Sequence, residues 1–221
     1  MNKQQELFDI FDAQMNPIGI APRHEVHRKG YWHQTFQCWI VSSFADETAI
    51  GPDSSKPALL FQMRHPDKDT FPGLLDISCA GHLLAGEQVE DGLRELVEEL
   101  GVEVVFEQLL PCGSYREEQY ISPNLIDREL CHVFILPREQ ALKDYRLQED
   151  EVTGLYRIGL ADVRLLAQGK AEHIVAEGVE TDAEGKLVPV RRTFGQADFV
   201  PHAPSYYELV LKGAERLFFK E

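Results

Sequence analysis

Apolar and polar residues alternate along much of the first 160 residues, a pattern typical of short strands separated by turns. Asn16-Pro17-Ile18-Gly19 predicts a turn, and residues 46–57, which contain Gly51-Pro52, predict the loop of a hairpin. The expected strands are residues 6–11, 35–43, 58–63, 103–110, 114–120, 128–136 and 151–158.

Helical spacing of apolar residues appears at residues 89–100, 160–167 and 205–219. Gly101 fits the end of the first helix and Ser205 the N-cap of the last. Residues 173–179 and 186–193, joined by a turn at 182–185, predict a polar hairpin. The last helix is expected to dock through an apolar stripe formed by Tyr206, Leu209, Val210 and Leu217. Residues 1–221 therefore predict a single α+β domain built mostly on a mixed sheet.

The chain of 221 residues carries 37 acidic and 22 basic side chains, which gives a formal net charge of −15. This excess would repel a phosphate backbone and argues against nucleic acid as a partner. We find neither the apolar run of a secretory signal nor a window that could span a membrane, so no membrane association is expected. The four cysteines form no Cys-x-x-Cys pair and are typical of reduced thiols, which predicts a cytoplasmic location.

The helix expected at residues 89–100 has one apolar and one acidic face. Its apolar face consists of Leu93, Leu96, Val97 and Leu100. On the opposite face, carboxylates three and four positions apart repel one another, and those in the last turn also oppose the helix dipole. These acidic residues are Asp91, Glu95, Glu98 and Glu99.

Such an acidic face can simply be solvated, but three features favour a cation site. No lysine interleaves the carboxylates, Gly81 and Gly86 allow the preceding loop to approach a ligand closely, and Gly101 ends the helix. Hard divalent cations bind clustered oxygen ligands. The segment therefore predicts a Mg²⁺ site, with Mn²⁺ as the alternative, and such an ion usually serves phosphate chemistry.

The same residues resemble the signature of the Nudix hydrolase family, G-x5-E-x7-R-E-U-x-E-E-x-G-U, in which U is a bulky aliphatic residue. One residue fewer separates Glu87 from Arg94 than in the signature. The resemblance implies a mixed β-sheet sandwiched between helices (α/β/α), with a core at about residues 30–168, an N-terminal β segment at 1–29 and a C-terminal hairpin and helix at 169–221. Homodimers are common in the family. The matching residues are Gly81, Glu87, Arg94, Glu95, Leu96, Glu98, Glu99, Gly101 and Val102.

The resemblance also implies a pyrophosphatase mechanism on a small-molecule diphosphate. Arg94 orients the neighbouring carboxylates, and water activated by the metal attacks phosphorus while a carboxylate takes the proton. The base lies either in the helix, at Glu95 or Glu98, or in a later loop, where Glu151 is the preferred residue of the run 148–152. The implied metal ligands are Glu87, Glu95, Glu98 and Glu99.

Beyond the signature, residues 6–160 resemble isopentenyl diphosphate isomerases and their Nudix relatives, through motifs such as Phe71-Pro72-Gly73 and Ala80-Gly81-His82. In the isomerase, histidines and acids at matching places bind a metal, and such a set suits a divalent transition metal. Candidate substrate-binding residues are Arg64, Lys68 and Gly81. The candidate second metal or substrate site consists of His27, His33, His82, Asp127 and Glu129.

Two alternatives to a hydrolase remain open at the level of the sequence. The isomerases carry a catalytic cysteine directly before the Gly-His pair, where this chain has Ala80 and places Cys79 one residue earlier. Because successive side chains of a strand face opposite sides, Cys79 is expected to point away from the site. A non-catalytic ligand-binding domain would usually lack the acids of the signature, which are present here. We therefore expect a Nudix phosphohydrolase.

Overall fold

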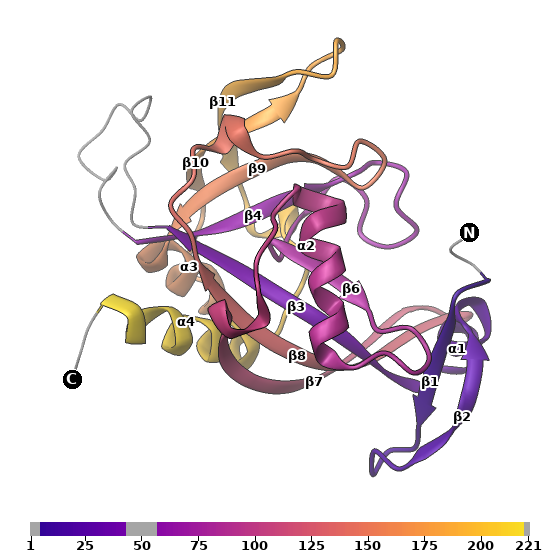
Figure 1. Cartoon of the computed structure of the whole chain (residues 1–221). Coiled ribbons are helices and arrows are strands. Elements are labelled where there is room, and N and C mark those ends of the chain that lie inside the picture. Colours follow the sequence, from indigo (N-terminus) through magenta and orange to yellow (C-terminus); the bar gives the residue numbers. More distant parts are fainter. Residues whose placement is uncertain (1–4, 43–56, 219–221) are drawn as a thin grey trace.

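Two long parallel strands, β3 (Trp32–Ser42) and β8 (Leu125–Pro137), form the middle of the molecule. In this computed structural model, which describes residues 5–42 and 57–218, they belong to one mixed sheet (Figure 1). β1 (Leu7–Phe11) pairs with the start of β3 at Trp32 and with β2 (Pro17–Pro22). β4 (Ala58–Arg64) pairs with the end of β3, and β9 (Val152–Gly159), β10 (Ile174–Thr181) and β11 (Leu187–Phe194) follow outward from β4.

Three further strands complete the sheet around this central row. The short strand β6 (Cys79–His82) pairs with β3, and β5 (Leu75–Asp76) pairs with β4. The long strand β7 (Leu110–Ser122) forms an antiparallel hairpin with β8. Because β8 also pairs with β3, the strand β3 lies between this hairpin and β6.

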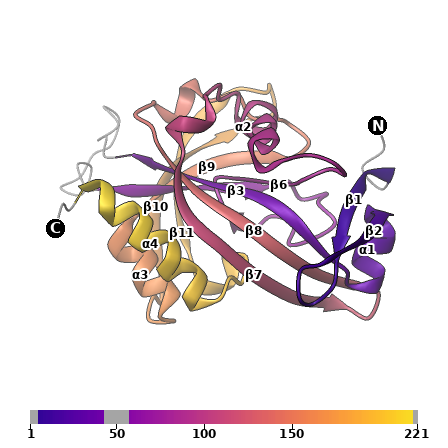
Figure 2. The same ribbon diagram turned by 60° about the horizontal axis from the view of Figure 1, so that its bottom comes forward.

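The sheet is covered by helices on both faces (Figures 1 and 2). On one face lies α2 (Leu93–Leu100), and on the other lie α3 (Leu160–Ala167) and α4 (Pro204–Phe218), while α1 (Arg23–Lys29) lies beside β1. The expected α/β/α arrangement is therefore confirmed. Short 3₁₀ helices occur at Val89–Gly92, Phe106–Gln108, Leu142–Asp144 and Gln196–Asp198.

Strand β3 contributes alternate residues to two hydrophobic cores, one on each face of the sheet. Its residues Phe36, Cys38 and Ile40 pack in the cluster beneath α2, whereas Trp39 and Val41 pack in the cluster beneath α3 and α4. Successive side chains of a strand face opposite sides, so a strand covered on both faces is apolar at nearly every position. The burial of Trp32–Ser42 follows this rule from Phe36 onward.

The acidic helix is shorter than its sequence pattern predicts. Residues Val89–Gly92 form a 3₁₀ turn, and the α-helix itself runs from Leu93 to Leu100. Gly101 ends it at φ 65°, and its N–H donates to the carbonyl groups of Leu96 and Val97. Glycine adopts this left-handed conformation without steric cost, so the predicted helix end is confirmed.

Three local predictions were wrong. Residues 103–110 form a loop and a 3₁₀ turn before β7 begins at Leu110, although their composition is apolar. Residues Pro17–Gly19 belong to β2, because the turn comes earlier, where Met15 N–H donates to Asp12 O. Ser205 lies inside α4, which begins at Pro204. The hairpin loop expected at residues 46–57 lies outside the described residues except for Pro57.

The C-terminal third packs as expected. The hairpin of β10 and β11 pairs along its full length, and α4 buries Tyr206 and Val210 against the sheet. Trp39 Nε1–H donates to the Tyr206 hydroxyl at 3.0 Å, which satisfies two large side chains that are fully buried. Residues 169–218 are therefore part of the folded domain.

Candidate active site

A cavity of about 660 Å³ opens between α2, the β7–β8 hairpin, α1 and the segment that precedes α4. Its volume is in the range of small-molecule sites. Most of the side chains around it are charged or polar. The apolar side chains that contribute to its lining are Phe71, Ile77, Ala80, Leu125 and Val200.

Three carboxylates of α2 line one side of this cavity. Glu99 is buried, with 5% of its surface exposed, and accepts a hydrogen bond from Gln62 Nε2 at 3.3 Å. Burial, together with the nearby charge of Glu95, raises the pKa of Glu99 to about 7. The side chain of Glu98 is 55% exposed at the cavity mouth. Buried, mutually repelling carboxylates fit a site for a divalent cation.

Gly81 on β6 makes room for this cluster. A Cβ atom at position 81 would lie 2.0 Å from Cδ of Glu95, which is closer than any real side-chain contact. The absence of a side chain therefore lets the Glu95 carboxylate lie directly against the β6 backbone. The glycine expected from the sequence to approach a ligand instead makes space for a carboxylate.

Arg94 and Glu87 form a separate pair beside the cavity. Glu87 accepts from Arg94 Nε at 3.0 Å and from Arg94 Nη2 at 3.2 Å, and also from Leu84 N–H at 2.7 Å. Arg94 also pairs with Glu95, and its Nη1 lies 3.6 Å from Glu98 Oε2. Arg94 lines the cavity, whereas the Glu87 carboxylate is directed to Arg94. The guanidinium group therefore holds the carboxylates of Glu95 and Glu98 in place.

The later loop with Glu151 is tied to the end of α2. Gln148 N–H donates to Glu99 O at 3.0 Å, and Glu151 N–H donates to Gln148 O at 3.0 Å. Glu151 is buried and its carboxylate pairs with Lys68 Nζ. Both side chains line the cavity with Glu99, so the structure brings the expected loop acid to the helix acids.

A second cluster of possible metal ligands lies across the cavity from α2. His27 Nε2 and His33 Nε2 each lie 3.5 Å from Asp127 Oδ1, and His82 Nε2 lies 3.6 Å from Glu129 Oε1. One ligand atom from each of His27, His33, His82 and Asp127 falls within 4.8 Å of the others. The five residues expected from the sequence are therefore brought together.

The hydrogen bonds of the His27 and His33 rings leave their Nε2 atoms free to bind a cation beside Asp127. His27 Nδ1 donates to Arg23 O at 2.9 Å and His33 Nδ1 donates to Tyr31 O at 3.1 Å. In a neutral ring the Nε2 atoms then carry lone pairs that face a carboxylate oxygen. Burial lowers the pKa of His33 to about 4, so the ring is neutral.

Within residues 5–42 and 57–218, three buried atoms of this cluster have no hydrogen-bond partner. A lone pair that faces another lone pair without a hydrogen between them is unfavourable, and buried polar atoms are normally paired. A divalent metal ion bound by His33 Nε2 and Asp127 Oδ1 would remove this contact between lone pairs and give both atoms a partner. The three atoms are His33 Nε2, His82 Nε2 and Asp127 Oδ1.

His82 differs from the other two histidines. Arg23 Nη1 donates to His82 Nδ1 at 3.3 Å, and an arginine can only donate. The neutral ring of His82 therefore carries its proton on Nε2, directed toward Glu129. Burial and the charge of Arg23 lower the pKa of His82 well below its usual range. In this arrangement His82 is a donor, and it becomes a metal ligand only if Arg23 withdraws.

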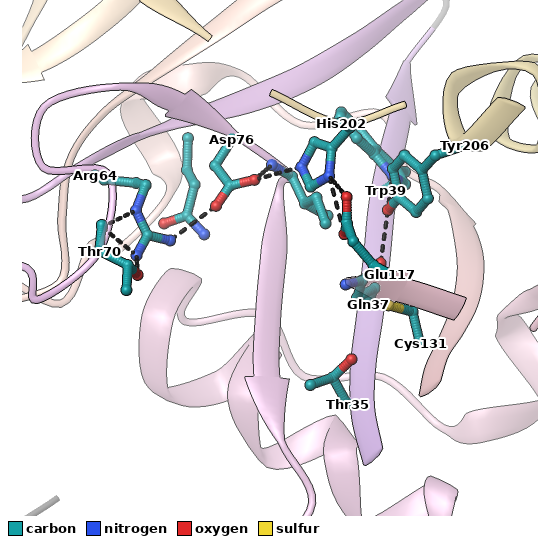
Figure 3. A network of polar contacts seen from close by, with 12 residues as sticks. Thr35, Gln37, Trp39, Arg64, Thr70, Asp76, Glu117, Cys131, His202 and Tyr206 are labelled. Carbon is teal, nitrogen blue, oxygen red and sulfur yellow. Dashed lines mark hydrogen bonds and ion pairs between the residues drawn. The ribbon is translucent and has the colours of Figure 1, made fainter. Parts of the chain in front are cut away.

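A row of charged residues, of which the sequence indicated only Arg64 as a site residue, forms the wall of the cavity near α4 (Figure 3). Arg64 Nη1 donates to Asp76 Oδ2 at 2.8 Å, and His202 contacts both Asp76 and Glu117 at 3.0 Å. Alternation along β7 directs Tyr115, Glu117 and Gln119 inward and could have indicated Glu117. We see no pattern around His202 that could have placed it here.

Cys79 is fully buried beneath α2, whereas its neighbour Ala80 lines the cavity. Cys79 lies opposite Cys38 in the register of β6 with β3, and both are free thiols. Burial raises the pKa of the Cys79 thiol well above the usual value. A buried, protonated thiol is a poor acid–base group. The structure therefore does not supply the cysteine that an isomerase would use at this position.

Comparison with known proteins agrees with this site. The NUDIX domain profile matches residues 49–177. An uncharacterized Nudix hydrolase of Clostridium acetobutylicum is 41% identical over 209 residues, which cover 95% of this chain and 97% of that protein. Isopentenyl-diphosphate Delta-isomerase 2 of Photorhabdus laumondii is 30% identical over 162 residues, or 73% and 81% of the two chains.

The fold also has a counterpart among solved structures. The protein DR0079 of Deinococcus radiodurans superposes with a TM-score of 0.50 at 18% identity, covering 74% of this chain and 88% of that one. The chain belongs to the Nudix hydrolase family, in a branch similar to isopentenyl diphosphate isomerases, and the expected phosphohydrolase class is confirmed. Among the described residues, no helix is long and apolar enough to cross a membrane.

Proposed function

We propose that the protein hydrolyses a diphosphate linkage in a small phosphorylated metabolite, such as a nucleoside diphosphate linked to a further group, and that it requires Mg²⁺. The observation that carries this proposal is the cluster of Glu95, Glu98 and Glu99 beside the Lys68–Glu151 pair in one cavity. A bound divalent cation supplies positive charge for the phosphate oxygens and lowers the pKa of water. Mn²⁺ is the alternative ion for the same ligands.

Each residue of the cluster has a distinct part in this proposal. Glu95, Glu98 and Glu99 hold the cation, and Arg94, braced by Glu87, keeps the carboxylates of Glu95 and Glu98 oriented. Glu87 was expected as a ligand, and its hydrogen bonds to Arg94 support the bracing part instead.

The proton from the attacking water goes to a carboxylate of the same cavity. Glu151 is our preferred acceptor, because its carboxylate pairs with Lys68 in the same cavity as the helix acids. Glu95 and Glu98 remain the candidates within α2. Arg64, Lys68 and the backbone at Gly81 line the space for the diphosphate.

We further propose that His27, His33 and Asp127 bind a second divalent metal, with His82 and Glu129 at its edge. The support is the pair of imidazole lone pairs that face one carboxylate oxygen in a buried place. Titration calorimetry with Mn²⁺ or Zn²⁺ should detect this site in the wild-type chain. His33→Ala should lose it while leaving binding at α2 in place.

The decisive test is a screen of Mg²⁺-dependent hydrolysis across ADP-ribose, diadenosine polyphosphates and isopentenyl diphosphate. Glu99→Gln should lower kcat by about 100-fold or more, because metal-assisted chemistry depends on this ligand. Glu107→Gln, at an exposed position outside the cavity, is the matched control. Equal activity of the two variants would contradict the metal assignment.

The same screen tests the isomerase alternative. Double-bond migration in isopentenyl diphosphate that is lost in Cys79→Ala would support that alternative in place of hydrolysis. No turnover of any substrate would favour a ligand-binding domain. The cytoplasmic location, the homodimer and the domain boundaries stay predictions.

A further inference from the structure

His202 joins two carboxylates that come from different parts of the chain. Its Nε2 lies 3.0 Å from Asp76 Oδ1, and its Nδ1 lies 3.0 Å and 3.2 Å from the two oxygens of Glu117 (Figure 3). The side chains are 5%, 9% and 11% exposed for His202, Asp76 and Glu117. Both ring nitrogens therefore act as donors, and the imidazole bridges β5 and β7.

The backbone places His202 at this point. Leu75 of β5 pairs with Phe199, and Val200 N–H donates to Leu75 O at 2.9 Å. This short pairing brings the segment before α4 alongside Asp76. Tyr206, in the first turn of α4, stacks on the imidazole with ring centroids 4.7 Å apart. The imidazole is therefore fixed by the backbone pairing at Val200 and by the ring of Tyr206.

Three charges in one buried place are costly for the fold. Burial disfavours the charged imidazole, but Glu117 and Asp76 overcome it and raise the pKa of His202 to about 10. Well-packed apolar residues would often serve stability equally well at such a position. Such a trio in the wall of a ligand-sized cavity points to a part in ligand binding.

The trio continues into the residues that contact the cavity. Asp76 fixes Arg64, whose guanidinium also donates to the Thr70 carbonyl at 2.9 Å and to its hydroxyl at 3.0 Å. On the other side, Glu117 is the cross-strand partner of Glu129. His202 therefore connects the Arg64 end of the cavity with the β7–β8 wall.

We propose that His202 is a positioning residue for substrate binding, which orients Arg64 through Asp76 and orients the Glu117 carboxylate, so that the C-terminal segment forms a working wall of the cavity. This inference rests on the proposed function of the cavity. The hydrogen bonds of His202 go to Asp76 on β5 and Glu117 on β7, so we expect it to act on substrate affinity and to leave the chemical step largely unchanged.

The first experiment compares His202→Gln with His173→Gln, a histidine of the same C-terminal third whose side chain is exposed. A glutamine amide donates at one end only, so it cannot bridge two carboxylates. For the best-hydrolysed substrate of the panel, we expect KM to rise about tenfold or more in His202→Gln, with kcat within about threefold of wild type. His173→Gln should match the wild type.

A double-mutant cycle shows whether His202 acts through its partner. Glu117→Gln alone should also raise KM, and it decides the question if His202→Gln does not fold. In the Glu117→Gln background, His202→Gln should add much less than its effect in the wild type, because contacting residues are not additive. Fully additive effects on KM, or a loss confined to kcat, would overturn the proposal.

Two measurements separate this proposal from the proposed hydrolysis. ¹⁵N NMR of histidine-labelled protein should show both ring nitrogens of His202 protonated at about pH 8, a signal absent from His202→Gln. Calorimetric titration with ADP-ribose in the absence of Mg²⁺ gives a Kd without turnover, and we expect binding to weaken in His202→Gln and to stay unchanged in His173→Gln. Hydrolysis with unchanged KM and Kd in His202→Gln refutes this inference alone, whereas weakened binding without hydrolysis refutes only the proposed reaction.

Discussion

Gly81 leaves space for a carboxylate of the acidic cluster. An added methyl group would overlap the Glu95 carboxylate, whose Cδ lies 2.0 Å from the ideal Cβ position. The carboxylate must then leave its place beside Glu99. A single hydrogen atom at position 81 therefore determines whether the acidic cluster can form.

Gly81→Ala should lower kcat by about 100-fold while the chain still folds, because it displaces Glu95 and leaves both cores intact. Steady-state kinetics and thermal unfolding measure the two effects. Gly159→Ala is the control, since the nearest atom to its Cβ is 3.7 Å away. Full activity in Gly81→Ala would show that Glu95 is not required where it lies.

Residue identities predicted much of the site, because the spacing of the α2 acids and Gly101 depends only on local geometry. The histidines and acids of the second cluster could be named from the resemblance, but not the Arg23–His82 hydrogen bond. That contact depends on how α1 lies against β6. His202 could not be placed at all, since it reaches Asp76 through a pairing 125 residues away in sequence, between Leu75 and Val200.

At the scale of the element, α2 is a helix whose stability conflicts with its function. Its last turn carries Glu98 and Glu99 without a basic residue, and Glu99 is buried beside Glu95. Local electrostatics therefore oppose the helix until a cation binds. The apolar face, with Leu96 and Leu100 fully buried, compensates for this cost.

Glu99→Gln should make the metal-free protein more stable, by about 1–3 kcal/mol, because it removes a buried carboxylate that lies beside another. In millimolar Mg²⁺ the difference in stability between the two proteins should shrink or change sign, since only the wild type gains binding energy. Urea denaturation with and without Mg²⁺ measures both. A wild type that is insensitive to Mg²⁺ would contradict a cation site on α2.

The strand errors of the prediction also have a cause at this scale. Residues 103–110 are apolar because Val102, Val104 and Phe106 fill the core beside α2, not because they form a strand. Burial alone does not distinguish a packed loop from a buried strand when the segment is short. The strands predicted at the alternating segments 114–120 and 128–136 were correct, because two-residue periodicity is specific to strands.

At the scale of the whole molecule, the His202 bridge predicts how stability depends on pH. The groups that face this imidazole are Asp76, Glu117, Tyr206 and Tyr207, with Arg64 behind Asp76. The pKa of His202 is about 10 in the folded chain, above its ordinary value of about 6.5. Its contribution is thus complete below about pH 6.5 and is lost as the pH rises toward 10.

The free energy of unfolding should therefore fall between about pH 6.5 and 10, by at most about 1.4 kcal/mol per pH unit from this group. His202→Gln should remove that part of the slope, whereas His173→Gln should keep it. Urea denaturation at a series of pH values in this window gives the comparison. Identical slopes in the three proteins would contradict a charged, buried His202.

The cavity wall that contains His202 also has a consequence for synthesis of the chain. Glu6, Arg23 and His202 all line one cavity, so its walls are complete only after residues 6–202 have been made. A growing chain on the ribosome can already contain every carboxylate of α2. It gains the wall formed by His202 only when the segment before α4 reaches Asp76, which we expect to delay the proposed hydrolysis until then.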